Sequence, residues 1–227
     1  PEEALKEGWE IEENKTFYYV KGEKVTGEQK IDGKWYFFEK ETGEMQTGFI
    51  ELPNKTVYYD ETGKMVYGKQ EINGVEYEFE VGNGALILGL QKTSKGKIYV
   101  LKGGKLVQGE YRINGKWYHF DEKTGIMSRG FVELGEKTVY YAESGEMCYG
   151  EKKIGGKWYY LKPGTGAMQI GFVQFPKKTV YYAESGEMLY GEQLIDGIEY
   201  EFKYGDGALI TGWKRTEEGI RYILSEG

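Results

Sequence analysis

Residues 27–47 read G-E-Q-K-I-D-G-K-W-Y-F-F-E-K-E-T-G-E-M-Q-T, and this stretch predicts a β-hairpin. The pair D-G at residues 32–33 accepts the positive φ angles of a type I′ turn, whose twist matches that of the flanking strands. The run W-Y-F-F at residues 35–38 places apolar side chains on both faces of the second strand, so we expect both faces to be covered. An isolated hairpin is only marginally stable in water, so this one needs neighbours that bury its rings.

The hairpin belongs to a series of internal repeats. Glycines that open similar units recur at spacings of 19 to 21 residues, and two unit types alternate. The opening glycines are Gly8, Gly27, Gly48, Gly68, Gly89, Gly109, Gly130, Gly150, Gly171, Gly191 and Gly212. Residues 48–88 and 171–211 align without gaps at an offset of 123, with 25 of 41 positions identical. No composition break interrupts the series, so we predict one domain over residues 1–227, with eleven units of which the last is truncated.

The even units, which open at Gly27 and at every second glycine after it, each carry a two-residue turn signal. These signals are Asp32-Gly33, Asn73-Gly74, Asn114-Gly115, Gly155-Gly156 and Asp196-Gly197. The pattern predicts an all-β solenoid of about ten stacked β-hairpins, with almost no helix. Only residues 1–7 (P-E-E-A-L-K-E) favour a helix, and we expect them to form a polar cap over the first hairpin.

The composition excludes several functional classes. With 37 acidic and 30 basic residues, the chain has a formal charge of −7, which argues against nucleic-acid or anionic-membrane partners. No apolar run approaches the ~20 residues of a membrane span, and no secretion signal opens the sequence. Cys148 and His119 are the only residues of their types, and we interpret both as packed side chains. We therefore expect no enzyme activity, no metal and no cofactor, and we interpret the repeated glutamates as solvated surface rather than glycosidase carboxylates.

The pattern G-[WF]-x₅₋₈-[WV]-Y-Y-x₄-G-x-M-x-x-G resembles the choline-binding, or cell-wall-binding, repeats of bacterial and phage lysins and surface proteins. Related repeats occur in clostridial toxins and streptococcal glucan-binding domains. The resemblance runs from Gly8 to the end of the chain, and it implies a left-handed superhelix with about three hairpins per turn. It also implies an extracellular or cell-wall-associated location. Relatives often dimerise through terminal repeats, and the oligomeric state stays open here.

In the choline-binding branch, the ligand lies between consecutive hairpins. The resemblance implies a cage made of the aromatic residue after an opening glycine, the tryptophan of W-Y-Y and the aromatic residue after the next opening glycine, with a methionine at the floor. Aromatic faces suit a quaternary ammonium group because it has no hydrogen to donate. The implied partial sites are Trp35 with Met45 and Phe49, Trp117 with Met127 and Phe131, and Trp158 with Met168 and Phe172.

The sequence departs from this cage at two positions. After the opening glycine the three tryptophan-bearing even units carry Glu28, Glu110 and Glu151, which could favour a cation by charge or could simply replace a lost ring. The odd units carry Val57, Val139 and Val180 where the pattern places the tryptophan. The other two even units have glutamates on the tryptophan face, at Glu76 and Glu78 and at Glu199 and Glu201, and we interpret those as lost sites.

Two function hypotheses follow. The first is a non-catalytic binding module that recognises choline, phosphocholine on teichoic acids or a related surface glycan. The second is an engineered or redesigned solenoid scaffold without a native ligand, because Asp, Asn and Ser number five each against 32 Glu and 26 Lys. Under the second hypothesis the tryptophan, methionine and phenylalanine sets are only the stacking core, and the methionines are filler.

Overall fold

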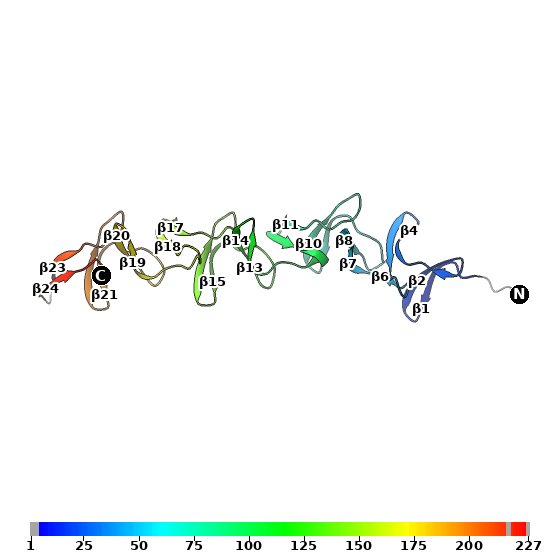
Figure 1. Ribbon diagram of the computed structural model, residues 1–227, viewed down its shortest axis with the longest axis horizontal. Coiled ribbons are helices and arrows are strands. Elements are labelled where there is room, and N and C mark those ends of the chain that lie inside the picture. Colours follow the sequence, from blue (N-terminus) through cyan, green and yellow to red (C-terminus); the bar gives the residue numbers. More distant parts are fainter. Residues whose placement is uncertain (1–4, 217–218, 226–227) are drawn as a thin grey trace. The chain divides into compact units, whose positions relative to one another are not determined.

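The computed structural model describes residues 5–216 and 219–225. These residues form eleven antiparallel hairpins that follow one another in chain order (Figure 1). The first two hairpins gain a short third strand, and the other hairpins are isolated two-stranded sheets. The predicted all-β hairpin solenoid is confirmed, with eleven hairpins rather than about ten.

The strands of the first five hairpins are β1 (Gly8–Glu12), β2 (Lys15–Val20), β3 (Glu23–Lys24), β4 (Gly27–Ile31), β5 (Lys34–Phe38), β6 (Met45–Gln46), β7 (Gly48–Leu52), β8 (Lys55–Tyr59), β9 (Gly68–Ile72), β10 (Val75–Phe79), β11 (Gly89–Lys92) and β12 (Lys97–Val100). A single 3-10 turn among the described residues, η1 (Lys102–Gly104), follows β12. The later strands are β13 (Gly109–Ile113), β14 (Lys116–Phe120), β15 (Gly130–Leu134), β16 (Lys137–Tyr141), β17 (Gly150–Ile154), β18 (Lys157–Leu161), β19 (Gly171–Phe175), β20 (Lys178–Tyr182), β21 (Gly191–Ile195), β22 (Ile198–Phe202), β23 (Gly212–Thr216) and β24 (Gly219–Ile223).

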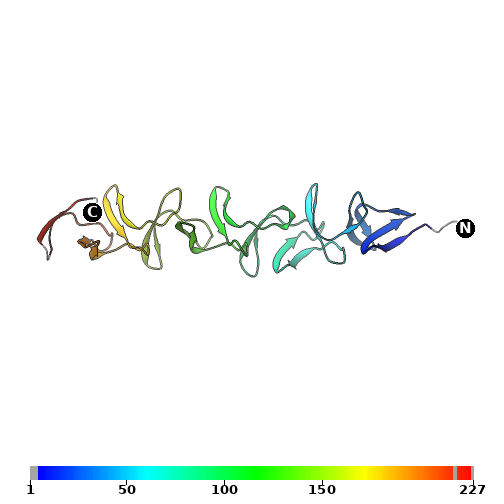
Figure 2. The same ribbon diagram turned by 90° about the horizontal axis from the view of Figure 1, so that it is seen from below.

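The chain divides into two compact units. The first comprises Pro1–Gly109 with Phe120–Met127, and the second comprises Glu110–His119 with Ser128–Gly227. Within each unit, successive hairpins project in different directions, which a second view makes plain (Figure 2). The single domain expected over residues 1–227 stays a prediction.

The turns of the even hairpins have the predicted geometry. Both turn residues have positive φ, for example 47° at Asp32 and 78° at Gly33. The same holds at the other four turns, which are Asn73-Gly74, Asn114-Gly115, Gly155-Gly156 and Asp196-Gly197. Because only Gly, Asn and Asp adopt this conformation readily, these pairs fix where each chain reversal occurs.

Burial alternates along the second strand of each hairpin. In β5, Tyr36 and Phe38 are buried, whereas Trp35 on the opposite face is 37% exposed. Phe37, which shares the face of Trp35, is half-buried, and its ring centroid lies 6.2 Å from that of Tyr59 in the following hairpin. The prediction that both faces are covered is therefore wrong at Trp35, because the next hairpin reaches Phe37 and leaves the tryptophan ring open.

A recurring backbone hydrogen bond joins successive hairpins. After β8 the chain bends back, and Met65 forms a bridge with Tyr59, the last residue of that strand. The N–H of Met65 then donates to the carbonyl oxygen of Trp35 in the preceding hairpin, at 2.9 Å. The same bond, again between residues 30 apart, links Leu86 to Thr56, Met127 to Lys97, Met147 to Trp117, Met168 to Thr138, Met188 to Trp158 and Leu209 to Thr179. This bond fixes the register between neighbours.

The methionine side chains pack against glycines of the next loop. Met168 covers Gly186, where φ is +83° and an added Cβ would collide with the methionine sulfur. Met45 covers Gly63 in the same way. The glycine of G-x-M is thus needed both for its backbone angle and for the close approach of the preceding hairpin. These contacts give the methionines a structural role, which was one of the two interpretations of the sequence.

The two ends of the series are described in part. Residues 1–4 of the expected helical cap lie outside the described residues, and Leu5 to Glu7 have no regular secondary structure. The carbonyl oxygen of Lys6 accepts a hydrogen bond of 3.0 Å from the N–H of Gly22. The last unit, expected to be truncated, still completes a hairpin of β23 and β24. In the described part of the chain, none of the helical structure has the length and apolar character needed to cross a membrane.

Candidate functional site

The three recurring tryptophans stand at the same place in their hairpins, directly after the lysine that begins the second strand. Trp35 and Trp117 are each 37% exposed, whereas Trp158 is half-buried. Trp158 packs against Val180 and Met188 of the following hairpin. The tryptophan face therefore lies toward the next odd hairpin, and one edge of it stays open to solvent.

A glutamate and a lysine meet beside each tryptophan. Glu28, on the first strand of the even hairpin, pairs with Lys55 of the next hairpin at 3.1 Å. The second pair, Glu110 with Lys137, is also 3.1 Å long, and the third, Glu151 with Lys178, is 3.0 Å long. The glutamate that stands in place of the third cage ring thus already holds an ammonium group supplied by the chain.

The lysine ammonium makes a further contact in two of the three places. Lys55 Nζ donates to the carbonyl oxygen of Asn83 at 3.1 Å, and Lys178 Nζ donates to that of Asp206 at 3.1 Å. Asn83 and Asp206 lie at equivalent positions, 123 residues apart, in the loop of the hairpin after the lysine. Lys55 and Lys178 therefore each connect three consecutive hairpins.

We name each site by its tryptophan. The Trp35 slot consists of Glu28, Trp35, Lys55 and Met65, the Trp117 slot of Glu110, Trp117, Lys137 and Met147, and the Trp158 slot of Glu151, Trp158, Lys178 and Met188. In the Trp158 slot these four residues line a cavity of about 180 Å³ together with Gly205 and Asp206. The first and third slots are related by the 123-residue repeat, and the second and third by the 41-residue repeat.

A buried tyrosine lies behind each glutamate. Tyr59 OH donates to Glu28 at 3.4 Å and Tyr141 OH donates to Glu110 at 3.5 Å. Tyr182 OH, at the same position in the Trp158 slot, is buried without a hydrogen-bond partner among the described residues. Burial first, and then the charge of the neighbouring glutamate, raises the pKa of all three phenols well above its usual range, at Tyr59, Tyr141 and Tyr182.

The predicted methionine partners need correction. In the Trp158 slot the methionine is Met188, 20 residues beyond the expected Met168, which instead packs on Gly186. Met45 likewise packs with Tyr36 and on Gly63. The sequence pattern places each methionine beside the tryptophan of its own unit. In the structure the chain bends back after the second strand, so the methionine lies against the preceding hairpin. The predicted grouping of Met127 with Trp117 and Phe131 spans the two units and stays a prediction.

The predicted phenylalanine partners belong to a different interface. The ring centroid of Phe49 lies 4.8 Å from that of Tyr58 and 5.2 Å from that of Tyr77, both edge-on. Phe172 has the same contacts with Tyr181 and Tyr200, at 4.8 and 5.1 Å. In Phe131 the corresponding distances are 4.9 Å to Tyr140 and 5.0 Å to Tyr159. These rings therefore pack edge to face between an odd hairpin and the next even one, where Phe49 and Phe172 are half-buried and Phe131 is 42% exposed.

The register also corrects the position that replaces tryptophan in odd units. Trp35 pairs with Lys30, two residues beyond Glu28, and the equivalent pairing in the next hairpin is Thr56 with Glu51. The residue at the tryptophan position is therefore Thr56, not the adjacent Val57. Matching the tyrosines of W-Y-Y and V-Y-Y misplaced the alignment by one residue, which moves a side chain to the opposite face of its strand.

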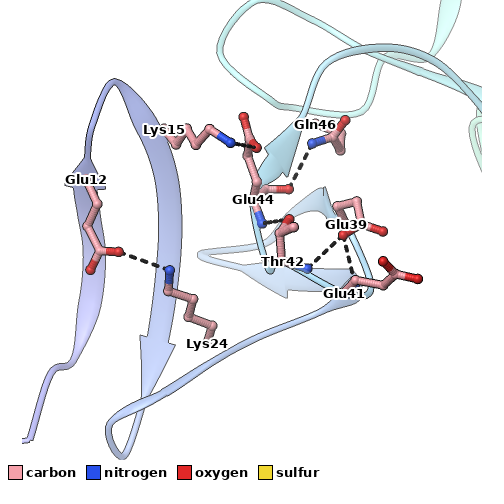
Figure 3. A network of polar contacts seen from close by, with 8 residues as sticks. All are labelled: Glu12, Lys15, Lys24, Glu39, Glu41, Thr42, Glu44 and Gln46. Carbon is pink, nitrogen blue, oxygen red and sulfur yellow. Dashed lines mark hydrogen bonds and ion pairs between the residues drawn. The ribbon is translucent and has the colours of Figure 1, made fainter.

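Lysine and glutamate form a second set of ion pairs on the outer surface. Near the first hairpin, Lys15 pairs with Glu44 at 2.9 Å and Lys24 pairs with Glu12 at 3.0 Å (Figure 3). The N–H of Glu44 also donates a hydrogen bond to Thr42 Oγ1 at 3.2 Å. Pairs equivalent to Lys15 with Glu44 occur at Lys116 with Glu146 and at Lys157 with Glu187. Many of the glutamates thus link consecutive hairpins rather than only solvating the surface.

The single histidine and cysteine have structural surroundings. His119 is buried, its ring lies 5.9 Å from that of Tyr141, and its Nδ1 lies 2.8 Å from Ser128 Oγ. Phe37 makes the equivalent contact with Tyr59 in another hairpin, so His119 fills an aromatic position. Cys148 is half-buried, and burial raises the pKa of its thiol. Among the described residues, no cluster of His, Cys, Asp or Glu is arranged to hold a metal ion.

The repeat pattern alone does not predict the slot lysines or the methionines that reach the slots. A signal was present, because K-T-V-Y-Y recurs at Lys55, Lys137 and Lys178, in each case 27 residues after the slot glutamate. Nothing in a single repeat reveals this pairing, since the two residues lie on different hairpins. The chemical result is a site that already binds one ammonium group beside an indole ring.

Comparisons with known proteins agree with this architecture. A family model described as a choline-binding repeat matches residues 7–48 and 128–171, and one described as a putative cell wall binding repeat matches residues 111–127. The structure of CbpJ from Streptococcus pneumoniae TIGR4 is similar at 27% sequence identity, with a TM-score of 0.63 and coverage of 97% of this chain and 93% of that chain. Among curated proteins none matches the chain in sequence.

Two further solved structures share the fold. Choline binding protein F from Streptococcus pneumoniae, solved with a peptidoglycan analogue, has 24% identity and a TM-score of 0.64, over 96% of this chain and 91% of that chain. The choline-binding domain of CbpL from the same organism has 23% identity and a TM-score of 0.57, over 82% and 97% of the two chains. The chain thus carries choline-binding, cell-wall-binding repeats at residues 7–48 and 111–171, and its stacked hairpins are similar to those of the solved choline-binding proteins.

Proposed function

We propose that this chain is a non-catalytic module that attaches to cell walls by recognising choline, or phosphocholine carried on teichoic acids, in its three tryptophan slots. The observation that carries the proposal is the slot itself. In each slot a glutamate of the even hairpin already holds the ammonium group of a lysine from the next hairpin, and in the Trp158 slot this pair lines one cavity with the indole, so the site suits a cation. The module would act outside the cell, at the wall.

The chemistry of a quaternary ammonium group fits such a slot. Its methyl groups carry the positive charge and donate no hydrogen bond, so it is held by aromatic faces and by nearby negative charge. Trp35 and Trp117 each present a partly exposed indole, and Glu28 and Glu110 supply the carboxylate. Choline reaches the carboxylate only by displacing the lysine ammonium, which then returns to water.

This competition makes each slot weak. One exposed cation–π contact contributes about 0.5–1 kcal/mol, and displacement of the lysine offsets part of any gain from the carboxylate. We expect each slot to bind choline in roughly the millimolar range or more weakly. Stable attachment then requires several slots to engage one repetitive polymer, where effective concentration raises the overall affinity.

A surface glycan is the second ligand class that we propose. The similar choline binding protein F was solved with a tetrasaccharide-pentapeptide analogue of peptidoglycan. Exposed indoles such as those of Trp35 and Trp117 offer flat faces on which sugar rings can stack. A glycan would leave the glutamate–lysine pairs intact, whereas choline would break them, and this difference separates the two ligands experimentally.

The test is a choline titration followed by tryptophan fluorescence. We expect a saturable change in the millimolar range, reduced in turn by Trp35→Ala, Trp117→Ala and Trp158→Ala. Trp213→Ala is the matched control, because Trp213 lies on the last hairpin, outside the slots, and is 78% exposed. If choline at tens of millimolar changes neither fluorescence nor melting temperature, the scaffold hypothesis replaces this proposal.

A further inference from the structure

Two even hairpins place a glutamate, Glu76 or Glu199, where their counterparts have tryptophan, and the first of them opens a cavity. In the hairpin of β9 and β10, Glu76 pairs with Glu71 across the sheet, as Trp158 pairs with Lys153 in its own hairpin. A cavity of about 630 Å³ opens beside Glu76, compared with about 180 Å³ beside Trp158. The smaller side chain thus leaves open the space that an indole occupies elsewhere.

Side-chain hydrogen bonds from neighbouring segments hold the walls of this cavity. Glu76 accepts hydrogen bonds from both the N–H and the hydroxyl of Ser94, which lies in a four-residue loop instead of a two-residue turn. Tyr77 OH donates to the carbonyl oxygen of Gly104 at 2.8 Å, in the 3-10 turn η1. The bonds from Ser94 also lower the pKa of Glu76. The repeat is therefore broken here by a locally fixed arrangement, not by a loose loop.

The lining of the cavity combines an apolar floor with a basic rim. Ile98 is buried, and Leu106 and Ile126 are half-buried beside it. The charged residues of the lining are Glu76, Lys95, Lys105 and Lys123, which gives +3 − 1 = +2. A positively charged lining is unusual in a chain whose formal charge is −7.

The three rim lysines differ in whether their charge has a partner. Lys95 Nζ donates to the carbonyl oxygen of Gly74 at 3.0 Å, so its charge has one fixed partner. Lys105 and Lys123 form no ion pair with any residue that the structure describes, unlike the slot lysines. The Glu76 carboxylate accepts its hydrogen bonds from Ser94 and, among the residues that the structure describes, forms no ion pair with either of these two lysines.

We infer that this cavity binds a small amphipathic anion, with an apolar body of ring size and one carboxylate, sulfonate or phosphate head. The volume lies within the range of small-molecule sites, which is about 300–1,000 Å³. The body rests on Ile98, Leu106 and Ile126, and the head meets Lys105 and Lys123 at the rim. The cavity thus selects the charge opposite to that of the tryptophan slots, and the inference is independent of choline binding.

The probe for this site is 2-naphthoate, titrated by isothermal calorimetry into the full chain. Neutralising two exposed lysines in Lys105→Gln/Lys123→Gln should weaken binding at least about tenfold, because each charge-assisted contact contributes on that scale. The matched control is Lys40→Gln/Lys64→Gln, which removes the same charge from exposed loop positions outside the cavity. It should leave the affinity unchanged.

Filling the cavity gives a second, independent test. Glu76→Trp restores the residue found at Trp35, Trp117 and Trp158, so it fits the hairpin, and it should abolish naphthoate binding. Naphthalene-2-methanol, which lacks the negative charge, should bind at least tenfold more weakly than naphthoate to the unmodified chain. The inference is overturned if naphthoate does not bind, if Glu76→Trp binds it normally, or if both lysine pairs have equal effects.

Discussion

The Trp158 slot and the cavity beside Glu76 occupy the same position in the repeat and have opposite chemistry. In the slot an indole fills most of the space and Lys178 is neutralised by Glu151. Beside Glu76 the space is open and its rim is basic. The two regions differ further behind the site, where Tyr182 of the slot is replaced by Val100.

The two regions show that backbone hydrogen bonds stack the hairpins, whereas side chains fill the spaces between them. The stacking hydrogen bond occurs with methionine or leucine as donor residue, as in Met188 to Trp158 and Leu209 to Thr179. It uses only backbone atoms, so it tolerates any side chain at the slot positions. Side chains at a few positions then set the volume and the charge of each interhairpin space, and the same scaffold accommodates both.

The largest effect that we expect is a loss of stability at alkaline pH, to which the three slot tyrosines contribute most. Burial raises the pKa of Tyr59, Tyr141 and Tyr182 above the value of about 10 in the unfolded chain. The fold therefore favours the neutral phenols, and their contribution is complete below pH 10 and is lost as the pH rises above it. The melting temperature should fall by roughly 10 °C between pH 9 and pH 11.

The control for this effect is the triple Tyr→Phe variant at the same three positions. It places at each slot a side chain that cannot ionise, as Val100 already does beside Glu76. The variant should lose clearly less stability than the unmodified chain between pH 9 and pH 11. Equal losses in the two proteins would mean that the slots do not govern the alkaline transition.

An exchange of the two compared residues should change stability in opposite directions. Trp158→Glu removes an indole that packs on Val180 and Met188, and we expect a loss of about 2 kcal/mol in the free energy of unfolding. Glu76→Trp fills a cavity and should add about 1 kcal/mol. Urea denaturation measures both. Two losses of similar size would show that the regions are not equivalent positions of one repeat.

Much of the fold was predictable because its signals are local. The pair Asp32-Gly33 specifies a turn through its own φ angles, and the alternation of Tyr36 and Phe38 specifies the buried face of the strand that follows. Because the same turn and strand pattern recurs along the chain, these local signals together predict stacked hairpins. The last hairpin was underestimated, since its second strand carries no recognisable aromatic motif.

The site was less predictable because its contacts cross from one hairpin to another. The sequence places Met168 near Trp158, yet the bend after each second strand delivers Met188 instead. Sequence spacing also cannot show that Lys178 reaches back to Glu151, because that distance depends on how two hairpins stack. From the sequence, the position of Glu76 was interpreted as a lost site because the tryptophan is missing there. The sequence does not show that the missing indole leaves a cavity.

The ion pairs of the slots also differ from those of the outer surface in how exposed the lysine side chain is. The Lys178 side chain is 22% exposed in its pair with Glu151, whereas that of Lys157 is 59% exposed in its pair with Glu187. Screening by water weakens the more exposed pair. Double-mutant cycles should give a coupling of about 1 kcal/mol for the slot pair and about 0.3 kcal/mol for the outer pair. Equal couplings would contradict the distinction between the two sets.

The most direct test of the central claim is the choline affinity of the triple variant Lys55→Met/Lys137→Met/Lys178→Met. The slot lysines occupy Glu28, Glu110 and Glu151, so we expect choline to compete with them for these carboxylates. Removing them frees three carboxylates beside three indoles, so choline should bind about tenfold more tightly, as measured by tryptophan fluorescence. Unchanged or weaker choline binding in this variant would contradict the claim that the slots are cation sites.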